Sequence, residues 1–451
     1  MQLALFDVDG YQALWRRNFE QSELGRVFLT IPFRELASKF QIKKKANGPG
    51  ANPIFSVEGA LGLMFLKHYT GLSDEKLIAQ VNVNWHYQCF CGLAPQIDCR
   101  IRDKDIVGRW RRFFGSDLNI DELQQDLAQS WKNDLPHLHI NMQDATVYES
   151  YIKYPTDLKL LWDCLMWLRG QMRDVCKAGG FAMPRSKYSQ RYDKYISFAK
   201  RRKKTHKLER RHRKAALYLL DKMKEQFQTL LNNWGRPAAG FLSAEVRQRL
   251  KTLRLILVQQ QYHFQHPEKS VPQRIVSFHK PYLRPIVRGK ENKPVEFGAK
   301  VHQVQVGGCN FIEHLDFEAF HEGNRLKKGV WMHRRLFGEV RQLSADGIYA
   351  TNRNRKWCRL NQIATNFIPK GAQGPLQHQA KALRHTLSTI RATRLEGSFG
   401  NEKNHYLLRK VRARTQPSEI AWIFFGVHCA NAVKVAKARA GPQAPNMALS
   451  A

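Results

Sequence analysis

The spacing of apolar residues changes character along this 451-residue chain, and the changes limit how it can fold. Helical spacing covers roughly the first 130 residues, and residues 138–148 then alternate apolar and polar side chains like a strand. Helical spacing returns from Thr156 to about His266, and strand signals resume between Arg274 and Phe317. A sheet assembled from segments on both sides of a helical insertion is therefore expected, which predicts a mixed α+β or α/β fold.

This pattern divides the chain into four parts. Residues 1–130 are expected to form an N-terminal all-α domain, and residues 131–155 and 271–435 a mixed sheet flanked by helices. Residues 156–270 are a basic helical insertion, and residues 436–451 are a C-terminal tail. Within the second part, Gly307 and Gly308 predict a turn between two strands. A helix is expected around residues 322–339, then strands over residues 340–345 and 363–368, and two further helices.

The N-terminal helices carry capping signals. Ser56 can cap a helix that Gly71 ends, and Ser73 can cap the next one. A third helix is expected over residues 103–114, with Gly115 ending it. Its arginines face away from its apolar residues and are candidate DNA contacts: Arg109, Arg111 and Arg112. Short helices joined by tight turns fit a helix-turn-helix-like DNA reader, and an ordinary bundle with a solvated charged face is the alternative.

The net charge of +36 indicates a polyanionic partner, with nucleic acid ahead of an anionic membrane surface. The longest apolar run, residues 421–433, includes His428 and Asn431 and is short for a membrane span of ~20 residues. No signal peptide is apparent, and no pair of the eight cysteines has CxxC spacing. We therefore expect a cytoplasmic protein with reduced thiols and no membrane partner.

The insertion contains the most basic stretch of the chain. Ten of the fifteen residues from 200 to 214 are Lys or Arg, and a helix with one basic face is expected there. This face could bind a DNA backbone, or it could be the solvated side of a dimerisation hairpin. The candidate DNA contacts here are Arg201, Arg202, Lys203 and Lys204, and a basic loop further on adds Arg284, Arg288 and Lys290.

Three acids stand out by their positions. Asp144 follows the first strand signal, Asp346 ends a later strand, and Glu396 lies on a C-terminal helix among seven Lys or Arg residues and one other acid. Each alone is more often a turn residue or a salt-bridge partner. Together they would form a pocket of oxygen ligands that suits Mg²⁺, with Mn²⁺ as a substitute, and two such ions can promote phosphoryl transfer. Lys403 lies nearly two helical turns after Glu396 and therefore shares its face.

These residues resemble the catalytic acids of bacterial insertion-sequence transposases of the DDE type, which share the ribonuclease-H-like fold of retroviral integrases. The resemblance rests on QDATV around Asp144, SADGIYATNRN around Asp346, the spacing of Glu396 to Lys403, and the block KPVEFGAKVHQV. The N-terminal GLSDEKLIAQV and RDKDIVGRWRRFFG also resemble the helical domain that these enzymes carry first.

The resemblance implies that Asp144, Asp346 and Glu396 bind the catalytic metal ions and that Lys403 contacts DNA near them. One departure is that Ala392 stands where relatives often have an arginine, four residues before the glutamate. Arg391 and Arg394 are nearby candidate DNA contacts, but on an ideal helix both point elsewhere.

The resemblance predicts a DNA transposase. We expect it to bind the terminal repeats of its own element as a homodimer, to hydrolyse strands, and to join 3′-hydroxyl ends to target double-stranded DNA. Its place would be the bacterial cytoplasm, associated with the nucleoid. A structure-specific nuclease that cuts without joining, and an inactive DNA-binding relic, are the alternatives.

Overall fold

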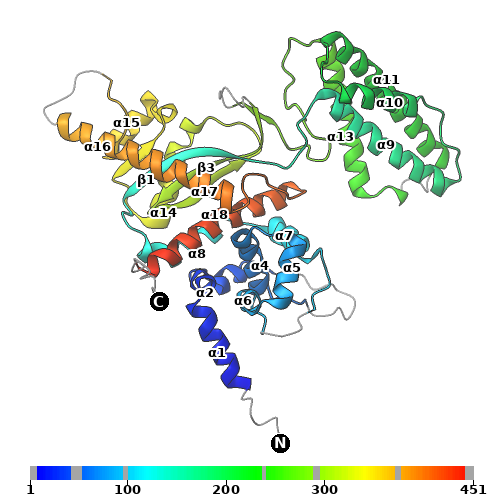
Figure 1. The fold of residues 1–451 in the computed structure, drawn as a ribbon. Helices are drawn as coiled ribbons and strands as arrows, with labels where there is room; N and C mark the ends of the chain where they lie inside the picture. Colours follow the sequence, from blue (N-terminus) through cyan, green and yellow to red (C-terminus); the bar gives the residue numbers. More distant parts are fainter. Residues whose placement is uncertain are drawn as a thin grey trace, which may run out of the picture. The chain divides into compact units, whose positions relative to one another are not determined.

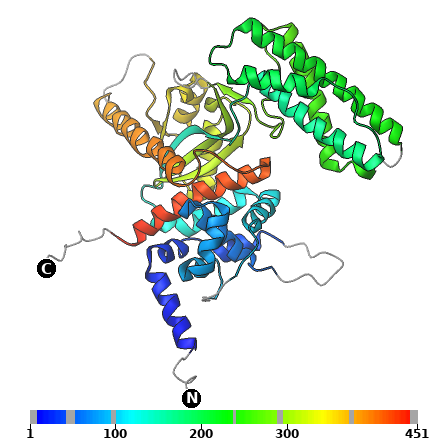
Figure 2. The same cartoon turned by 45° about the vertical axis from the view of Figure 1, so that its right-hand side comes forward.

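The protein divides into two compact units in a computed structural model (Figures 1 and 2). One unit contains Met1–Tyr151 and Gly298–Ala451, and the other is Ile152–Phe297. The structure describes residues 8–41, 53–94, 100–235, 240–287, 295–370 and 377–441. Arg288 and Lys290, two of the expected DNA contacts, lie outside the described residues.

A mixed sheet forms the centre of the first unit. Its strands follow the order β4-β3-β1-β5-β6, and β2 pairs with the beginning of β3. Strand β3 is antiparallel to both β1 and β4, whereas β5 is parallel to both β1 and β6. The bounds are β1 Ile140–Glu149, β2 Pro285–Val287, β3 Val295–Val306, β4 Cys309–Asp316, β5 Gln342–Ala345 and β6 Ala364–Thr365. The mixed α+β architecture expected from the periodicity is therefore confirmed.

The turn between β3 and β4 is the one that the two glycines predict. Gly307 and Gly308 have φ of 57° and 88°, a left-handed conformation that favours glycine. Strand β6 is only two residues long, shorter than the expected strand over residues 363–368.

Helices cover both faces of the sheet. Helix α14 (Leu326–Phe337) packs against β1, where Gly329 allows close approach of the Gln143 side chain. The helix after β5, α15, covers Asn352–Leu360, and α16 covers Gln377–Ile390. A π-helical turn, Arg391–Leu395, joins α16 to α17 (Glu396–His405), and α18 (Gln416–Arg439) follows.

Among the described residues, eight α-helices precede the sheet, and the caps at Ser56, Gly71 and Ser73 follow the sequence. The Ser56 side chain accepts a hydrogen bond from the Gly59 N–H, Gly71 has φ of 67°, and Ser73 caps the next helix. The bounds are α1 Val8–Gln21, α2 Glu23–Phe28, α3 Phe33–Ser38, α4 Val57–Thr70, α5 Asp74–Val83, α6 Trp85–Phe90, α7 Ile106–Asp117 and α8 Ile120–Trp131.

The expectation that Gly115 ends a helix is wrong, because α7 continues to Asp117. A Cβ on Gly115 would lie 2.6 Å from the carbonyl oxygen of Pro417, in the first turn of α18. The glycine therefore serves close packing between α7 and α18 rather than helix termination.

The N-terminal helices and the sheet share one hydrophobic core. The ring of Phe425 in α18 contacts Phe65 of α4 and Phe114 of α7, at centroid distances of 5.4 and 5.7 Å. Phe311 of β4 belongs to the same cluster of buried side chains. Helix α18 is buried on nearly every side over residues 418–433, as a mostly apolar helix in a protein interior should be. Residues 1–130 and the sheet, expected as separate domains, thus belong to one unit.

In the described residues, no helix is long and apolar enough to cross a membrane.

The second unit is a helical bundle with a core of its own. Its helices are α9 Asp157–Gly179, α10 Tyr188–Lys200, α11 His206–Trp234 and α13 Ala244–Gln265. Thr156, Thr205 and Ser243 cap three of them, and Leu161, Leu165, Leu220 and Ile256 are among its buried residues.

The prediction of a helix through residues 200–214 is wrong for the first part of this segment. Residues 201–205 are not helical, and α11 begins only at His206 after the Thr205 cap. The side-chain oxygen of Thr205 accepts from the Leu208 N–H, which provides a helix start inside the basic run.

Candidate active site

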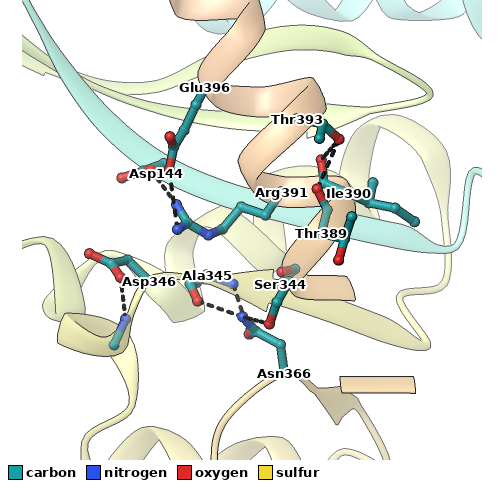
Figure 3. Close-up of polar contacts among 12 residues, drawn as sticks. Asp144, Ser344, Ala345, Asp346, Asn366, Thr389, Ile390, Arg391, Thr393 and Glu396 are labelled. Carbon is teal, nitrogen blue, oxygen red and sulfur yellow. Dashed lines mark hydrogen bonds and ion pairs between the residues drawn. The ribbon is translucent and has the colours of Figure 1, made fainter. Parts of the chain in front are cut away.

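Two of the three predicted acids lie on neighbouring parallel strands. Gln143 of β1 pairs with Ala345 of β5, and Asp144 and Asp346 are the next residues of each segment. Asp144 is therefore within β1, while Asp346 follows the end of β5 (Figure 3). The Asp346 side chain is exposed and accepts a hydrogen bond of 2.7 Å from the Gly347 N–H. The parallel pairing thus brings together two acids that are far apart in the sequence.

The third acid reaches the same region from a helix. Glu396 is the first residue of α17, and its side chain is 54% exposed. The end of the π-helical turn and α17 pack on β1 through Leu395 and Phe399, which form a small buried cluster with Met142. Phe399 therefore packs α17 against the sheet.

Arg391 connects two of these acids. Its guanidinium donates to the Asp144 carboxylate at 2.7 Å and lies 3.2 Å from the Glu396 carboxylate (Figure 3). The π-helical turn explains this position, because the Glu396 N–H donates to the Arg391 carbonyl, five residues earlier. The extra residue in the turn places Arg391, rather than Ala392, beneath Glu396. The interpretation that Arg391 points elsewhere assumed an ideal α-helix and is wrong. Arg394 is exposed.

Lys403 is on the same side of β1 as the acids. Its ammonium group donates to the Thr146 hydroxyl at 2.8 Å and lies 5.9 Å from the centre of the Tyr148 ring. Thr146 is two residues beyond Asp144 in β1, and alternate residues of a strand share a face.

The environment of Asp144 opposes its ionisation. Burial raises the pKa of this carboxyl to about 6, and the negative charges of Glu322 and Asp346 add to the rise. The Ala145 N–H and the Arg391 guanidinium act in the opposite direction. A cation close to Asp144 is therefore favoured, and Arg391 supplies one here.

Glu322 is an acid that the sequence interpretation missed. It lies in the short 3₁₀ turn Glu322–Asn324 and forms an ion pair of 2.8 Å with Lys300 of β3. A single glutamate in a loop carries no spacing signal, so only the folded chain shows its proximity to Asp144.

The described residues contain no group of three His, Cys, Asp or Glu side chains close enough to hold a metal ion. Asp144, Asp346 and Glu396 nevertheless present the carboxylate oxygens that Mg²⁺ and Mn²⁺ prefer. A buried, partly neutralised carboxylate such as Asp144 also fits a cation. The donor set thus suits such an ion chemically, with Arg391 now holding the positive charge between Asp144 and Glu396.

The prediction that Arg111 contacts DNA is wrong. This side chain is 7% exposed, contacts the Asp74 carboxylate at 3.0 and 3.1 Å, and lies 4.5 Å from the Trp422 ring. It therefore holds α7 against α5 and α18 and is not accessible to a phosphate. Arg109 and Arg112 are exposed, and Arg109 forms an ion pair with Asp103.

The other predicted DNA contacts are in the second unit. Arg284 is half-buried and donates to the Gln273 side chain and to the carbonyls of Pro281 and Leu283. Four exposed residues precede α11: Arg201, Arg202, Lys203 and Lys204.

Comparison with known families bears on the N-terminal helices. Residues 15–113 match the family model described as "Transposase domain (DUF772)". The resemblance to transposases is confirmed. The transposase-domain match extends from within α1 to within α7 and includes none of the three acids. Searches of curated proteins and of solved structures found no match.

Proposed function

We propose that the protein is a DNA transposase of the DDE type, with a ribonuclease-H-like sheet that carries Asp144, Asp346 and Glu396. The observation on which this rests is the meeting of Asp144 and Asp346 on parallel strands, with Glu396 joined to Asp144 through Arg391. The transposase-domain match in the N-terminal helices supports the same class of enzyme. The substrate would be double-stranded DNA, bound by a homodimer in the bacterial cytoplasm, in association with the nucleoid.

Asp144, Asp346 and Glu396 would hold Mg²⁺, or Mn²⁺ in its place. Such ions, when bound, acidify a water molecule and stabilise charge on phosphate oxygens. Arg391 orients the carboxylates of Asp144 and Glu396, since its guanidinium contacts both. Lys403, held by Thr146, can donate to a non-bridging phosphate oxygen of the strand that is cut.

The test measures strand cleavage and strand joining with duplexes made from the DNA that flanks the gene. We expect Asp144→Asn, Asp346→Asn and Glu396→Gln each to reduce Mg²⁺-dependent cleavage by at least about 100-fold, as loss of a metal ligand should. Glu339→Gln, an exposed acid on the same unit, is the matched control and should cleave normally.

Three outcomes decide between the alternatives. Unchanged cleavage in the three acid variants refutes the assignment of these acids. Cleavage that needs all three acids, but gives no joined product from a pre-cut end, identifies a nuclease. Binding without any cleavage by the wild-type chain identifies an inactive relic.

A further inference from the structure

A basic groove runs between α10 and α11 of the second unit. It encloses about 530 Å³, with Trp162 of α9 among its lining residues. Five basic side chains line it, against one acid, Asp193; they are Arg191, Lys194, Arg201, Arg211 and His212. Two of these come from α10, which lies outside the basic run that the sequence emphasises. The groove therefore collects positive charge from α10, the loop after it and α11.

The arginines and the lysine of the groove are not used for internal ion pairs. In the part of the chain that the structure describes, Arg191, Lys194, Arg201 and Arg211 form no salt bridge, and the last three are exposed. Three basic residues of the same run that lie outside the groove have contacts within the bundle instead.

Arg213 pairs with Asp157 at 3.1 Å. Arg210 lies 4.5 Å from the Phe264 ring, and Lys204 lies 5.7 Å from the Phe198 ring. The basic run thus contains residues that contact the bundle as well as residues that line the groove.

Three of the groove's positive charges act on one residue, His212. His212 stacks on Phe198 with a centroid distance of 4.5 Å, and both residues line the groove. Burial lowers the pKa of His212, and the positive charges of Arg211, Arg201 and Lys194 lower it further. Three cations from α10, the following loop and α11 therefore act on the same small volume, where a phosphate group would relieve their mutual repulsion.

The aromatic residues of the groove do not offer an open ring to a nucleotide base. Trp162 is 2% exposed, and Tyr195 stacks on it at 4.9 Å with an interplanar angle of 17°. Nearby, Arg169 covers the Tyr188 ring at 4.1 Å. Base stacking needs a free ring face, so the groove is built for charge and not for base recognition.

We propose that this groove binds the phosphodiester backbone of duplex DNA without regard to base sequence. The proposal rests on the proposed function, since it takes DNA as the substrate. The DNA-binding surface is thus formed by Arg191, Lys194, Arg201 and Arg211, and not by consecutive residues of the basic run.

The test is duplex binding by the full chain in EDTA, where metal-dependent cleavage does not occur. The variant Lys194→Gln/Arg201→Gln/Arg211→Gln is compared with Lys222→Gln/Lys251→Gln/Lys269→Gln. The control removes the same charge from exposed lysines of the second unit that do not line the groove. A 30-base-pair duplex of arbitrary sequence is the probe, and its affinity is measured over a range of KCl concentrations.

We expect the groove variant to bind at least about 10-fold more weakly at low salt. The slope of log K against log salt should fall by roughly 2–3, because about one counterion is released per phosphate contact. The control should keep most of the wild-type slope. Equal losses of affinity in the two triple variants would overturn the proposal, because DNA would then be attracted by the net positive charge of the second unit and not by the groove.

A charge-conserving variant, Lys194→Arg/Arg201→Lys/Arg211→Lys, separates charge from folding and should bind like the wild type. If it loses affinity as the neutral variant does, the proposal fails. Selective loss of binding to duplex RNA, with DNA binding retained, would also contradict it. This binding experiment measures no cleavage, so its outcome does not affect the cleavage test of Asp144, Asp346 and Glu396. The outcome of that cleavage test likewise does not affect the binding experiment.

Discussion

At the residue scale, the position of Arg391 depends on one irregular turn. An α-helix through residues 391–396 would direct this side chain away from Glu396, because five residues make about 1.4 turns, which is far from a whole number. The π-helical hydrogen bond from the Glu396 N–H to the Arg391 carbonyl adds one residue to the turn. Such turns occur often at functional sites, and this one places a cation between two candidate catalytic acids.

Arg391→Ala should weaken Mn²⁺ binding at pH 7 and slow cleavage by about 10-fold or more. Arg391 lowers the pKa of Asp144, so its loss raises that pKa further above about 6. Metal ions bind the ionised carboxylate, so Mn²⁺ affinity in the wild type should rise with pH through about 6, and in the variant only at higher pH. Titration followed by electron paramagnetic resonance measures this. Arg394→Ala is the control, and tighter Mn²⁺ binding by Arg391→Ala would contradict the assigned role.

Glu402 is a second buried acid behind the site, on α17. It is 1% exposed, accepts a hydrogen bond of 2.6 Å from the Asn310 amide, and contacts the Tyr148 hydroxyl of β1. Burial raises its pKa from 4.5 to about 7. The folded state therefore holds this proton more tightly than the unfolded state, and its contribution to stability is lost as pH rises from about 4.5 to about 7.

Glu402→Gln should remove this part of the pH dependence. Relative to the wild type, its free energy of unfolding should increase by roughly 1–3 kcal/mol between pH 4.5 and pH 8. Urea unfolding at several pH values measures the difference, with Glu339→Gln as a surface control. A wild-type-minus-variant difference that does not change with pH would show that the pKa of Glu402 is the same in the folded and unfolded states.

At the scale of elements, most helix starts follow from local chemistry. Ser56 and Ser73 each cap a helix at the position that the sequence suggests, because the cap satisfies backbone N–H groups of the same segment. Thr156 and Ser243 cap helices in the same way. Helix ends that depend on other elements do not follow in this way. Gly115 resembles a helix stop, yet it permits the close approach of α18, hundreds of residues away in the sequence.

Gly115→Ala should lower the free energy of unfolding by about 1–3 kcal/mol, because the new Cβ would overlap the Pro417 carbonyl and force α7 away from α18. Gly108→Ala is a matched control in the same helix. A Cβ at Gly108 has no neighbour within 4 Å, so that variant should be stabilised by about 0.5–1 kcal/mol. Denaturant unfolding measures both, and equal effects would rule out the packing role of Gly115.

At the scale of the whole molecule, the first unit is assembled around α18. This helix packs on α4, α7 and β4, so the transposase-domain match and the sheet with the acids have a common core. Neither part buries its apolar surface fully without α18, and truncation before α18 is expected to expose both.

The second unit has its own core, so removal of the whole second unit should leave the first unit folded. Glu149 of β1 pairs with Gly298 of β3, so a short Gly/Asn turn can replace Ile152–Phe297 at the end of this antiparallel pair. We expect the shortened chain to keep cooperative thermal unfolding and Mn²⁺ binding, and to lose at least about 10-fold in duplex affinity. Loss of the first unit's cooperative transition, measured by circular dichroism, would show that the two units do not fold independently.

Four properties can be inferred from the sequence alone: the period of each segment, the capped helix starts, the order of the three acids and the large positive charge. These properties are local or additive, so they can be inferred without knowing which segments meet. Three further facts appear only in the folded chain: Arg111 is buried against Asp74, Arg391 replaces Ala392 beneath Glu396, and Glu322 acts on Asp144. The physical reason is that side-chain burial and charge pairing depend on contacts between residues far apart in the chain, and no pattern within one segment specifies them.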